Sequence, residues 1–284
     1  MSLTTTEANL SDEAFQELLR LVHKLTGISI GQNRKSMLVG RLRKRLRAND
    51  LDRFEQYIEL IKQDSGEVAL FVDSVTTNET YFYRTPRVWD HLTQEFIPSW
   101  LARGENRPLR LWSAAASTGE EAHTAGILLE DVKRRHPRFA YQILGTDISA
   151  RVVGVARQGV YRDRAIERFR NAHADLFDKY MVGNDVDGFK TAATIRNNIS
   201  FQEHNLFRPR AESNKYDIVM LRNVLIYFNK ADQERVLSNI EQAMTPNGLL
   251  YIGESESLSQ LRTGFEPVVP LVYRRRMTGM RDAA

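Results

Sequence analysis

The sequence predicts an α/β protein with a mainly parallel sheet, preceded by a separate all-helical domain. From about residue 11 to residue 75 the apolar residues recur with the 3.6-residue period of helices. Beyond residue 88, short β-rich runs alternate with helical stretches, which is typical of α/β layer folds. A third pattern, short apolar-polar alternation between Gly and Asp turns at 178–198, predicts a small antiparallel insert.

The first domain is expected to span residues 1–75. Its breaks at 27–33, 49–52 and 64–66 are short enough for neighbouring helices to pack antiparallel. The segment RKSMLVGRLRKRLR at 34–47 holds seven basic residues and no acid. Because the net charge of the whole chain is only +4, the basicity is a local feature.

The remaining chain is interpreted as a linker at 76–88 that contributes to a ligand site, an α/β domain at 89–276 and a flexible tail at 277–284. The expected strands are 109–114, 141–147, 199–203, 216–221, 249–253 and 271–274. The expected helices are 88–102, 120–136, 150–156 and 231–243.

Composition excludes several classes of function. No run approaches 18 apolar residues, and the polar start lacks the features of a signal peptide, so we expect a soluble, cytoplasmic protein without membrane insertion. The chain has no cysteine, which excludes disulfides and thiol nucleophiles. Its 6 histidines lack metal-ligand spacing, so no metal is expected.

The stretch WSAAASTGEE at 112–121 is a strand, a turn and a helix start with one glycine and two glutamates. Phosphate-binding corners contain several glycines and a lysine instead. Taken alone, Thr118 and Glu121 could form a capping box. The next strand ends at Asp147, which alone could be the N-cap of the helix that begins near Ala150.

Together the two acidic positions are more informative, because the carboxyl ends of parallel strands meet at one edge of a sheet. An acid at a strand tip can accept hydrogen bonds from both hydroxyls of a ribose. A ligand with a ribose and an ammonium but no phosphate would account for this corner, and S-adenosylmethionine fits that description.

Six motifs make the sequence resemble the chemotaxis receptor methyltransferases, the CheR family. They occur in the family's order over about 180 residues, after a similar basic helical domain. The motifs are TTNETYFYR at 76–84, WSAAASTGEE at 112–121, GTDIS at 145–149, HNLF at 204–207, DIVMLRNVLIYF at 217–228 and NGLLYIGESESL at 247–258.

The resemblance implies a Rossmann-like fold of the class I methyltransferase type and transfer of a methyl group from S-adenosyl-L-methionine to glutamate side chains of chemoreceptors, with S-adenosyl-L-homocysteine as product. By the same resemblance, the cofactor-binding positions are Asn78, Thr80, Arg84, Glu121, Asp147, Asn205, Leu206, Arg222 and Asn223. Arg84 and Tyr227 are the candidate catalytic residues. Pattern alone leaves ordinary turn, cap and ion-pair roles open for each of them.

Three departures from the family pattern are evident. Ala122, His123 and Thr124 stand where Pro, Tyr and Ser are common, and Tyr83 replaces a usual Phe. The insert around GNDVDG is short, so we expect tethering by a receptor's C-terminal peptide to be weak or absent.

The expected partner is the acidic helical bundle of a chemoreceptor. The basic helix could dock there through Arg41, Arg43, Lys44, Arg45 and Arg47, although a solvated basic face is the simpler alternative. A methyltransferase acting on RNA or another small substrate is a rival hypothesis, but no [DN]PPY-like motif is present and no nucleic-acid partner is expected. A catalytically silent, cofactor-sensing scaffold is the second rival.

Overall fold

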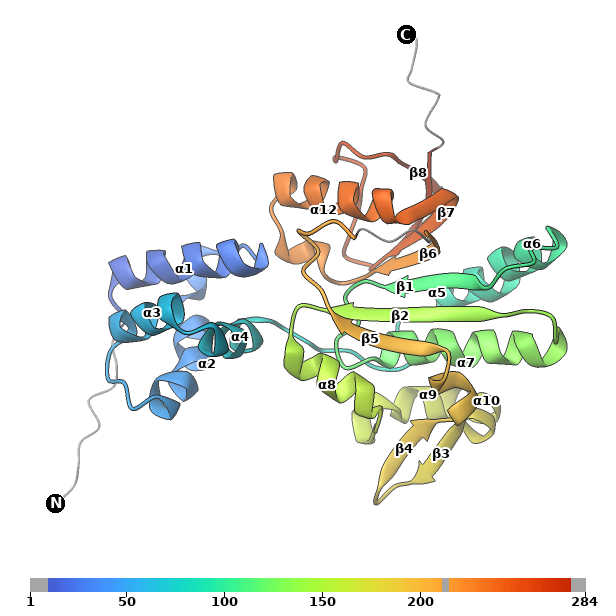
Figure 1. Cartoon of the computed structure of the whole chain (residues 1–284), viewed down its shortest axis with the longest axis horizontal. Helices are drawn as coiled ribbons and strands as arrows, with labels where there is room; N and C mark the ends of the chain where they lie inside the picture. Colours follow the sequence, from blue (N-terminus) through green and yellow to red (C-terminus); the bar gives the residue numbers. More distant parts are fainter. Residues whose placement is uncertain (1–9, 211–214, 277–284) are drawn as a thin grey trace, which may run out of the picture. The chain divides into compact units, whose positions relative to one another are not determined.

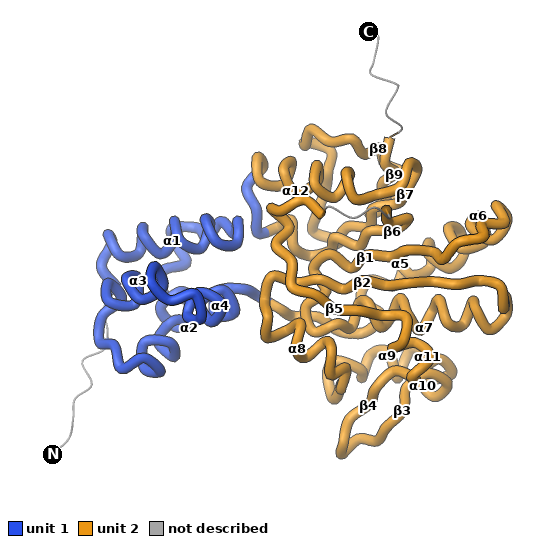
Figure 2. Tube along the Cα trace, viewed as in Figure 1, with its two compact units in different colours: residues 1–77, 227–229 blue, residues 78–226, 230–284 orange. Residues whose placement is uncertain are grey.

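The computed structural model describes residues 10–210 and 215–276. Its contacts divide the chain into two compact units, shown in Figure 2: Met1–Thr77 with Tyr227–Asn229, and Asn78–Ile226 with Lys230–Ala284. The predicted tail at 277–284 lies outside the described residues.

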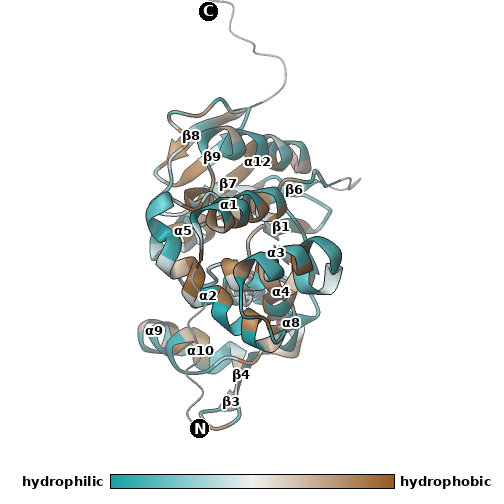
Figure 3. Ribbon diagram, turned by 90° about the vertical axis from the view of Figure 1, so that its left-hand side faces the viewer, coloured by the Kyte–Doolittle hydropathy of each residue, from teal (hydrophilic) through white to brown (hydrophobic). Residues whose placement is uncertain are grey.

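The helical unit contains α1 (Asp12–Thr26), the 3-10 turn η1 (Gln32–Arg34), α2 (Lys35–Ala48), α3 (Phe54–Gln63) and α4 (Ser65–Val75). The Ser11 hydroxyl caps α1 by accepting the Ala14 N–H, and Gly27 ends it with a φ of 75°. In Figure 3, hydrophilic and hydrophobic bands alternate along α1 and α2, as expected for helices with one buried face. Their apolar faces meet in a single core.

The second unit is built on a seven-stranded sheet in the order β5-β2-β1-β6-β7-β9-β8. The strands are β1 (Leu109–Ser113), β2 (Tyr141–Asp147), β5 (Ile199–Glu203), β6 (Tyr216–Leu221), β7 (Met244–Ile252), β8 (Phe265–Val269) and β9 (Val272–Arg275). The first five strands in this order pair in parallel, and β9 and β8 are antiparallel. The order reverses direction between β1 and β6, which makes that point the topological switch point.

Helices cover the sheet, as Figure 1 shows for α7 (Glu120–Arg135), α8 (Ala150–Gln158) and α12 (Lys230–Ala243). All six residues of β6 are buried, as a strand covered on both faces requires. The remaining helical elements are α5 (Pro86–His91), η2 (Leu92–Phe96), α6 (Ile97–Ala102), η3 (Asp163–Ala165), α9 (Glu167–Ala172), α10 (Ala174–Tyr180), α11 (Ala193–Arg196) and η4 (Leu225–Tyr227).

The predicted antiparallel insert is present as the two-stranded sheet of β3 (Met181–Asn184) and β4 (Gly188–Thr191). Its core includes Phe177 and Phe189 and continues to Ile127 of α7 and to Phe82. The insert is therefore anchored on the same helix that begins at the acidic corner.

Several sequence-based boundaries differ from the structure: β7 begins at Met244 and not at residue 249, and some other ends shift by one or two residues. The helix expected at 88–102 contains a π-helical segment, η2, which ends two residues before Pro98, a residue without the N–H needed to continue the helical ladder. Strand β8 was missed because four of its five residues are not buried and Pro267 interrupts its pattern. Helices α9 and α10 were missed because 6 and 7 residues are too few to establish a helical period.

Candidate functional site

The candidate site lies at the carboxyl ends of the five parallel strands. The loop 114–119 follows β1, Asp147 ends β2, Asn205 follows β5, Arg222 follows β6 and Glu256 lies just beyond β7. Ligands of open α/β sheets bind at this edge, near the switch point between β1 and β6.

The corner after β1 depends on its single glycine. Gly119 has a φ of 99°, a conformation that side chains disfavour. A Cβ there would lie 2.8 Å from the Tyr161 hydroxyl and 3.0 Å from the Ala156 Cβ. The glycine is thus required by both the backbone conformation and the close packing beneath the corner.

Glu121 is part of a polar network and not of a capping box. Its Oε1 accepts the Ser113 hydroxyl at 2.7 Å and its Oε2 accepts Nη1 of Arg222 at 2.9 Å. The N-cap is Gly119, without a side-chain cap, so the capping-box interpretation with Thr118 is wrong. Because the Arg222 and Glu121 side chains are only 2% and 11% exposed, their charges compensate each other with little help from water.

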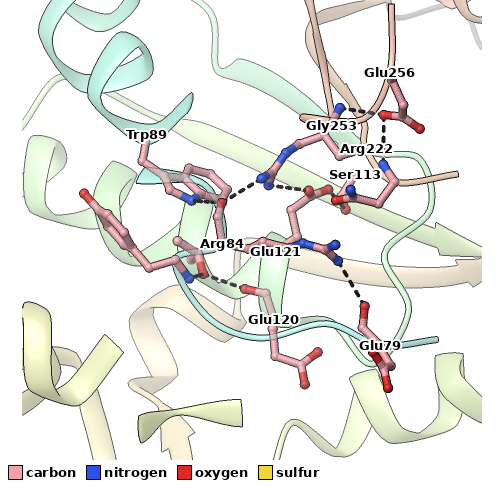
Figure 4. A network of polar contacts seen from close by, with 12 residues as sticks. Glu79, Arg84, Trp89, Ser113, Glu120, Glu121, Arg222, Gly253 and Glu256 are labelled. Atoms are coloured by element: carbon pink, nitrogen blue, oxygen red, sulfur yellow. Dashed lines mark hydrogen bonds and ion pairs between the residues drawn. The ribbon is translucent and has the colours of Figure 1, made fainter. Parts of the chain in front are cut away.

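Arg222 connects this pair to the segment before α5, as Figure 4 shows. Its Nη2 donates to the Arg84 carbonyl at 2.6 Å, and the same carbonyl accepts Nε1 of Trp89 at 3.0 Å. The Nε of Arg222 is buried and has no hydrogen-bond partner among the residues that the structure describes. A buried donor without an acceptor is costly, so a bound ligand that supplies one would be favoured.

The segment that carries Arg84 is bent unusually. Tyr83 and Thr85 have φ values of 59° and 61°, and such residues cost about 1–3 kcal/mol each. The Arg84 guanidinium donates to the Glu79 carbonyl at 3.1 Å and lies 5.7 Å from the centre of the Tyr81 ring. Within the described ranges it has no carboxylate partner, so the surface ion-pair interpretation is wrong.

Asp147 is held by backbone groups from two loops. Its Oδ2 accepts the Ser117 N–H at 2.9 Å and its Oδ1 accepts the Ser149 N–H at 3.1 Å. Ser149 is the N-cap of α8, accepting the Val152 N–H, so the N-cap interpretation of Asp147 is wrong. The Ser117 hydroxyl also donates to the Asn78 carbonyl at 2.8 Å, which brings the linker to the β2 tip.

The other predicted positions have more ordinary surroundings. The Asn205 side chain accepts the Phe207 N–H at 3.0 Å, which agrees with the simpler interpretation that it satisfies a backbone group. Leu206 is buried, and the side chain of Thr80 is half-buried. Tyr227 is grouped with the helical unit, where its carbonyl accepts the Ser29 N–H at 2.8 Å.

Sequence reasoning gave no role to Ser113, Glu120 or Glu256. Glu120 is 4% exposed, and burial raises the pKa of its carboxyl although the Thr118 hydroxyl donates to it at 2.7 Å. Glu256 had no signal in the sequence, because its carboxylate binds backbone N–H groups of residues 223–225. Ser113 had no signal, because its partner Glu121 lies on a different element.

Two of the residues that depart from the family pattern, His123 and Thr124, make packing and hydrogen-bond contacts beneath the corner. His123 is buried, its Nδ1 lies 2.9 Å from the Thr191 hydroxyl on β4, and its ring packs against Tyr161. The Thr124 hydroxyl donates to the Glu120 carbonyl and accepts the Tyr83 N–H at 3.1 Å. Both side chains therefore tie α7 to neighbouring segments beneath the corner.

Two arginines of the predicted docking strip on α2 make contacts within their own unit, and docking itself stays a prediction. Arg45 forms two hydrogen bonds with the buried Glu67, at 2.8 and 2.6 Å. Burial alone would raise the pKa of Glu67, but hydrogen bonds from Arg45 and Tyr57 outweigh it and hold that pKa below its usual value. Arg41 donates to the Val75 carbonyl at 2.6 Å. Lys44 and Arg47 remain exposed.

The mainly parallel sheet suits an S-adenosylmethionine-dependent methyltransferase, and comparison with protein families shows this class. Residues 78–271 match the family model described as the SAM binding domain of CheR methyltransferase, and residues 13–76 match its all-alpha domain. The chain therefore belongs to the CheR methyltransferase family, as its motifs predict, and the predicted fold class and cofactor are confirmed.

Relatives match over nearly the whole chain. Chemotaxis protein methyltransferase 2 of Pseudomonas aeruginosa is 33% identical, with 88% of this chain and 89% of the relative covered. The chemotaxis protein methyltransferase of Salmonella typhimurium is 31% identical, covering 93% and 90%. That of Borreliella burgdorferi is 27% identical, with 94% of this chain and 95% of the relative covered.

No helix of the described residues combines the length and the apolar character that are needed to cross a membrane.

Proposed function

We propose that this enzyme transfers the methyl group of S-adenosylmethionine to glutamate side chains of chemoreceptors and forms glutamyl methyl esters. The matching relatives are chemotaxis protein methyltransferases, which supports a substrate in the chemotaxis system. The observation that carries the proposal is the pair of acids at this edge of the sheet, Glu121 in the first turn of α7 and Asp147 at the end of β2, in a corner without lysine or a glycine-rich loop. When bound, the cofactor supplies an electrophilic methyl group on a sulfonium.

The side chains at the corner suit this cofactor. The Ser117 and Ser149 N–H groups hold the Asp147 carboxylate at the carboxyl end of β2, where an acid can accept hydrogen bonds from ribose hydroxyls. The Glu121–Arg222 pair offers both charges that an amino-acid end carrying an ammonium and a carboxylate needs. The unpartnered Nε of Arg222 is a further donor for such a carboxylate. The other proposed cofactor contacts are Asn78, Thr80, Arg84, Asn205, Leu206 and Asn223.

The acceptor needs little activation. A glutamate side chain has a reference pKa of about 4.3, so it is an anion at neutral pH and no general base is required. Its carboxylate oxygen would attack the methyl carbon in line while the methyl–sulfur bond breaks. The protein then contributes orientation, for which effective molarities of about 10⁵–10⁸ M are attainable, and a site with little water.

Arg84 and Tyr227 are the proposed orienting residues. The Arg84 guanidinium has no acid partner within the described ranges and is held by a carbonyl and an aromatic ring, so it can interact with an incoming carboxylate. A direct, close ion pair would make that carboxylate a poorer nucleophile, and an orienting role is therefore proposed for Arg84. Docking of an acidic receptor bundle is assigned to the exposed part of α2, around Lys44 and Arg47.

A labelled-transfer assay tests the proposal. The enzyme is incubated with methyl-labelled cofactor and either cytoplasmic fragments of chemoreceptors or RNA. We expect label on the receptor fragment only, and we expect mild base to release it, because esters are base-labile and N-methyl groups are not. Label on RNA would support the rival methyltransferase hypothesis. Cofactor binding without transfer to any receptor fragment would favour the scaffold hypothesis.

A further inference from the structure

We infer that Glu256 is a positioning residue that fixes Arg222, and through it the amino-acid end of the cofactor site. The inference rests on the cofactor site proposed above. Glu256 lies four residues beyond β7, and the residue is only 9% exposed. Burial of a carboxylate is costly unless it is paired or fully hydrogen-bonded, so its surroundings require an explanation.

The Glu256 carboxylate accepts four backbone N–H groups, two on each oxygen. Its Oε2 accepts Asn223 at 2.9 Å and Gly253 at 2.5 Å, and its Oε1 accepts Val224 and Leu225, both at 2.8 Å. Figure 4 shows Glu256 beside Gly253, next to Arg222. Hydrogen bonds to an ionised acceptor are about twice as strong as neutral ones, so this side chain joins the end of β7 to the turn after β6.

The turn after β6 needs such support. Asn223 has a φ of 59°, a left-handed conformation that is unfavourable for residues other than glycine. The N–H groups of three consecutive residues, 223–225, converge on one carboxylate and form an anion-binding nest. Glu256 therefore compensates the strain of a turn that begins directly after Arg222.

The close approach of the two strand ends also depends on Gly253. A Cβ at this position would lie 2.8 Å from the Asn223 backbone nitrogen and 2.8 Å from Oε2 of Glu256. Because one of these neighbours is backbone, the contact could be relieved only by a shift of the turn. Gly253 and Glu256 thus fix the same turn from β7.

The position of Arg222 follows from this turn. Its guanidinium is 2% exposed and makes hydrogen bonds to Glu121 and to the Arg84 carbonyl. A displaced turn would move the Cα of Arg222 and misalign both bonds, although Glu256 touches neither partner. Glu256 is therefore expected to affect cofactor affinity through Arg222.

Replacement of the charge tests the inference with little change in shape. Glu256→Gln keeps one acceptor oxygen and puts an NH2 group against two of the four N–H donors, whichever way the amide is turned. Glu254→Gln is the matched control, because Glu254 is 58% exposed and pairs with Arg87, which is also exposed. Arg222→Ala and the double variant complete a mutant cycle.

The measurement is the dissociation constant of S-adenosylhomocysteine, obtained by calorimetry on the full chain at a temperature where each variant is folded by circular dichroism. Glu256→Gln is expected to weaken binding by about tenfold or more, as a small misplacement of a binding group does. Glu254→Gln should bind as the wild type does. Because Glu256 acts through Arg222, the double variant should bind no more weakly than Arg222→Ala alone.

The possible outcomes distinguish a failure of the role of Glu256 from a failure of the proposed cofactor site. If Arg222→Ala weakens binding but Glu256→Gln does not, or if their effects add fully, the role of Glu256 is overturned and the cofactor site stands. If Arg222→Ala binds as the wild type does, both are overturned. Should Glu256→Gln not fold, Gly253→Ala takes its place in the cycle with the same expected loss, and unchanged affinity in that variant contradicts the inference.

Discussion

Arg222 at the tip of β6 and Glu121 in the first turn of α7 form an ion pair of 2.9 Å, almost closed off from water. The pair joins the end of β6 to α7, the helix that follows β1, at the topological switch point. The negative charge of Glu121 is compensated by Arg222 within the protein, so the site offers a ligand both a negative and a positive group.

Removal of one partner should leave a buried, uncompensated charge. Arg222→Met is expected to lower the free energy of unfolding by about 3 kcal/mol, measured by urea denaturation. The double variant Arg222→Met/Glu121→Gln should recover part of that loss, because it no longer contains the unpaired carboxylate. If the single variant is as stable as the wild type, the pair is not the closed contact described here.

Arg84 should matter for turnover. Arg84→Ala is expected to lose most methyl transfer to receptor fragments, because the guanidinium is proposed to orient the acceptor or the amino-acid end of the cofactor. Arg87→Ala is the control, since Arg87 is 54% exposed and pairs with the exposed Glu254. Steady-state kinetics with varied receptor and cofactor measure both variants. Unaltered kcat and KM for Arg84→Ala would remove the assignment.

The exposed basic residues of α2 should affect receptor docking and not the cofactor. Lys44→Glu/Arg47→Glu is expected to raise the KM for receptor fragments by about tenfold at low salt and to make the rate less sensitive to ionic strength. Affinity for S-adenosylhomocysteine should be unchanged. Equal salt sensitivity of docking in the double variant and the wild type would contradict the proposed surface.

Arg45→Met should destabilise the helical unit, because it leaves the buried Glu67 unpaired.

His123 should make stability depend on pH. Burial lowers its pKa to about 4, whereas an unfolded histidine titrates near 6.5. Between these values the unfolded state binds a proton that the folded state does not, so the free energy of unfolding falls as the pH drops from 6.5 to 4. The loss amounts to about 3 kcal/mol at pH 4, and above pH 6.5 His123 contributes no pH dependence.

His123→Gln removes this group and keeps a side chain that can bond to Thr191. Urea denaturation of both proteins at pH 7.5 and pH 4.5 measures the effect. The wild type should lose more stability than the variant over this range, and the difference isolates His123 from His91 and His173, whose pKa values burial also lowers. Parallel losses in the two proteins would show that His123 takes up its proton in the folded state.

The sheet was predictable because its strands are buried runs that end in recognisable turns. The bounds of β2, β5 and β6 agree with the sequence-based bounds, whereas β8 and the short helices α9 and α10 lack a period long enough to detect. Among site residues, Glu121 and Asp147 were visible as acids, one in the helix start after β1 and one at the end of β2. Ser113 and Glu256 were not, because their roles depend on contacts between elements that are distant in sequence.

The unassigned role of Glu256 illustrates this limit. Its motif was recognised as part of the family pattern, but a carboxylate that binds the backbone of residues 223–225 leaves no trace in the spacing of side chains. The reverse holds for Arg45, which the charge pattern placed on a docking surface. Its partner Glu67 is 22 positions away, and only the packing of α2 against α4 brings the two together.

A crystal structure of the enzyme with S-adenosylhomocysteine tests the central claim most directly. We predict that the ribose hydroxyls lie within hydrogen-bond distance of the Asp147 carboxylate and that the amino-acid end lies beside Glu121 and Arg222. A ligand bound away from these three residues would contradict the account, whatever the activity of the enzyme.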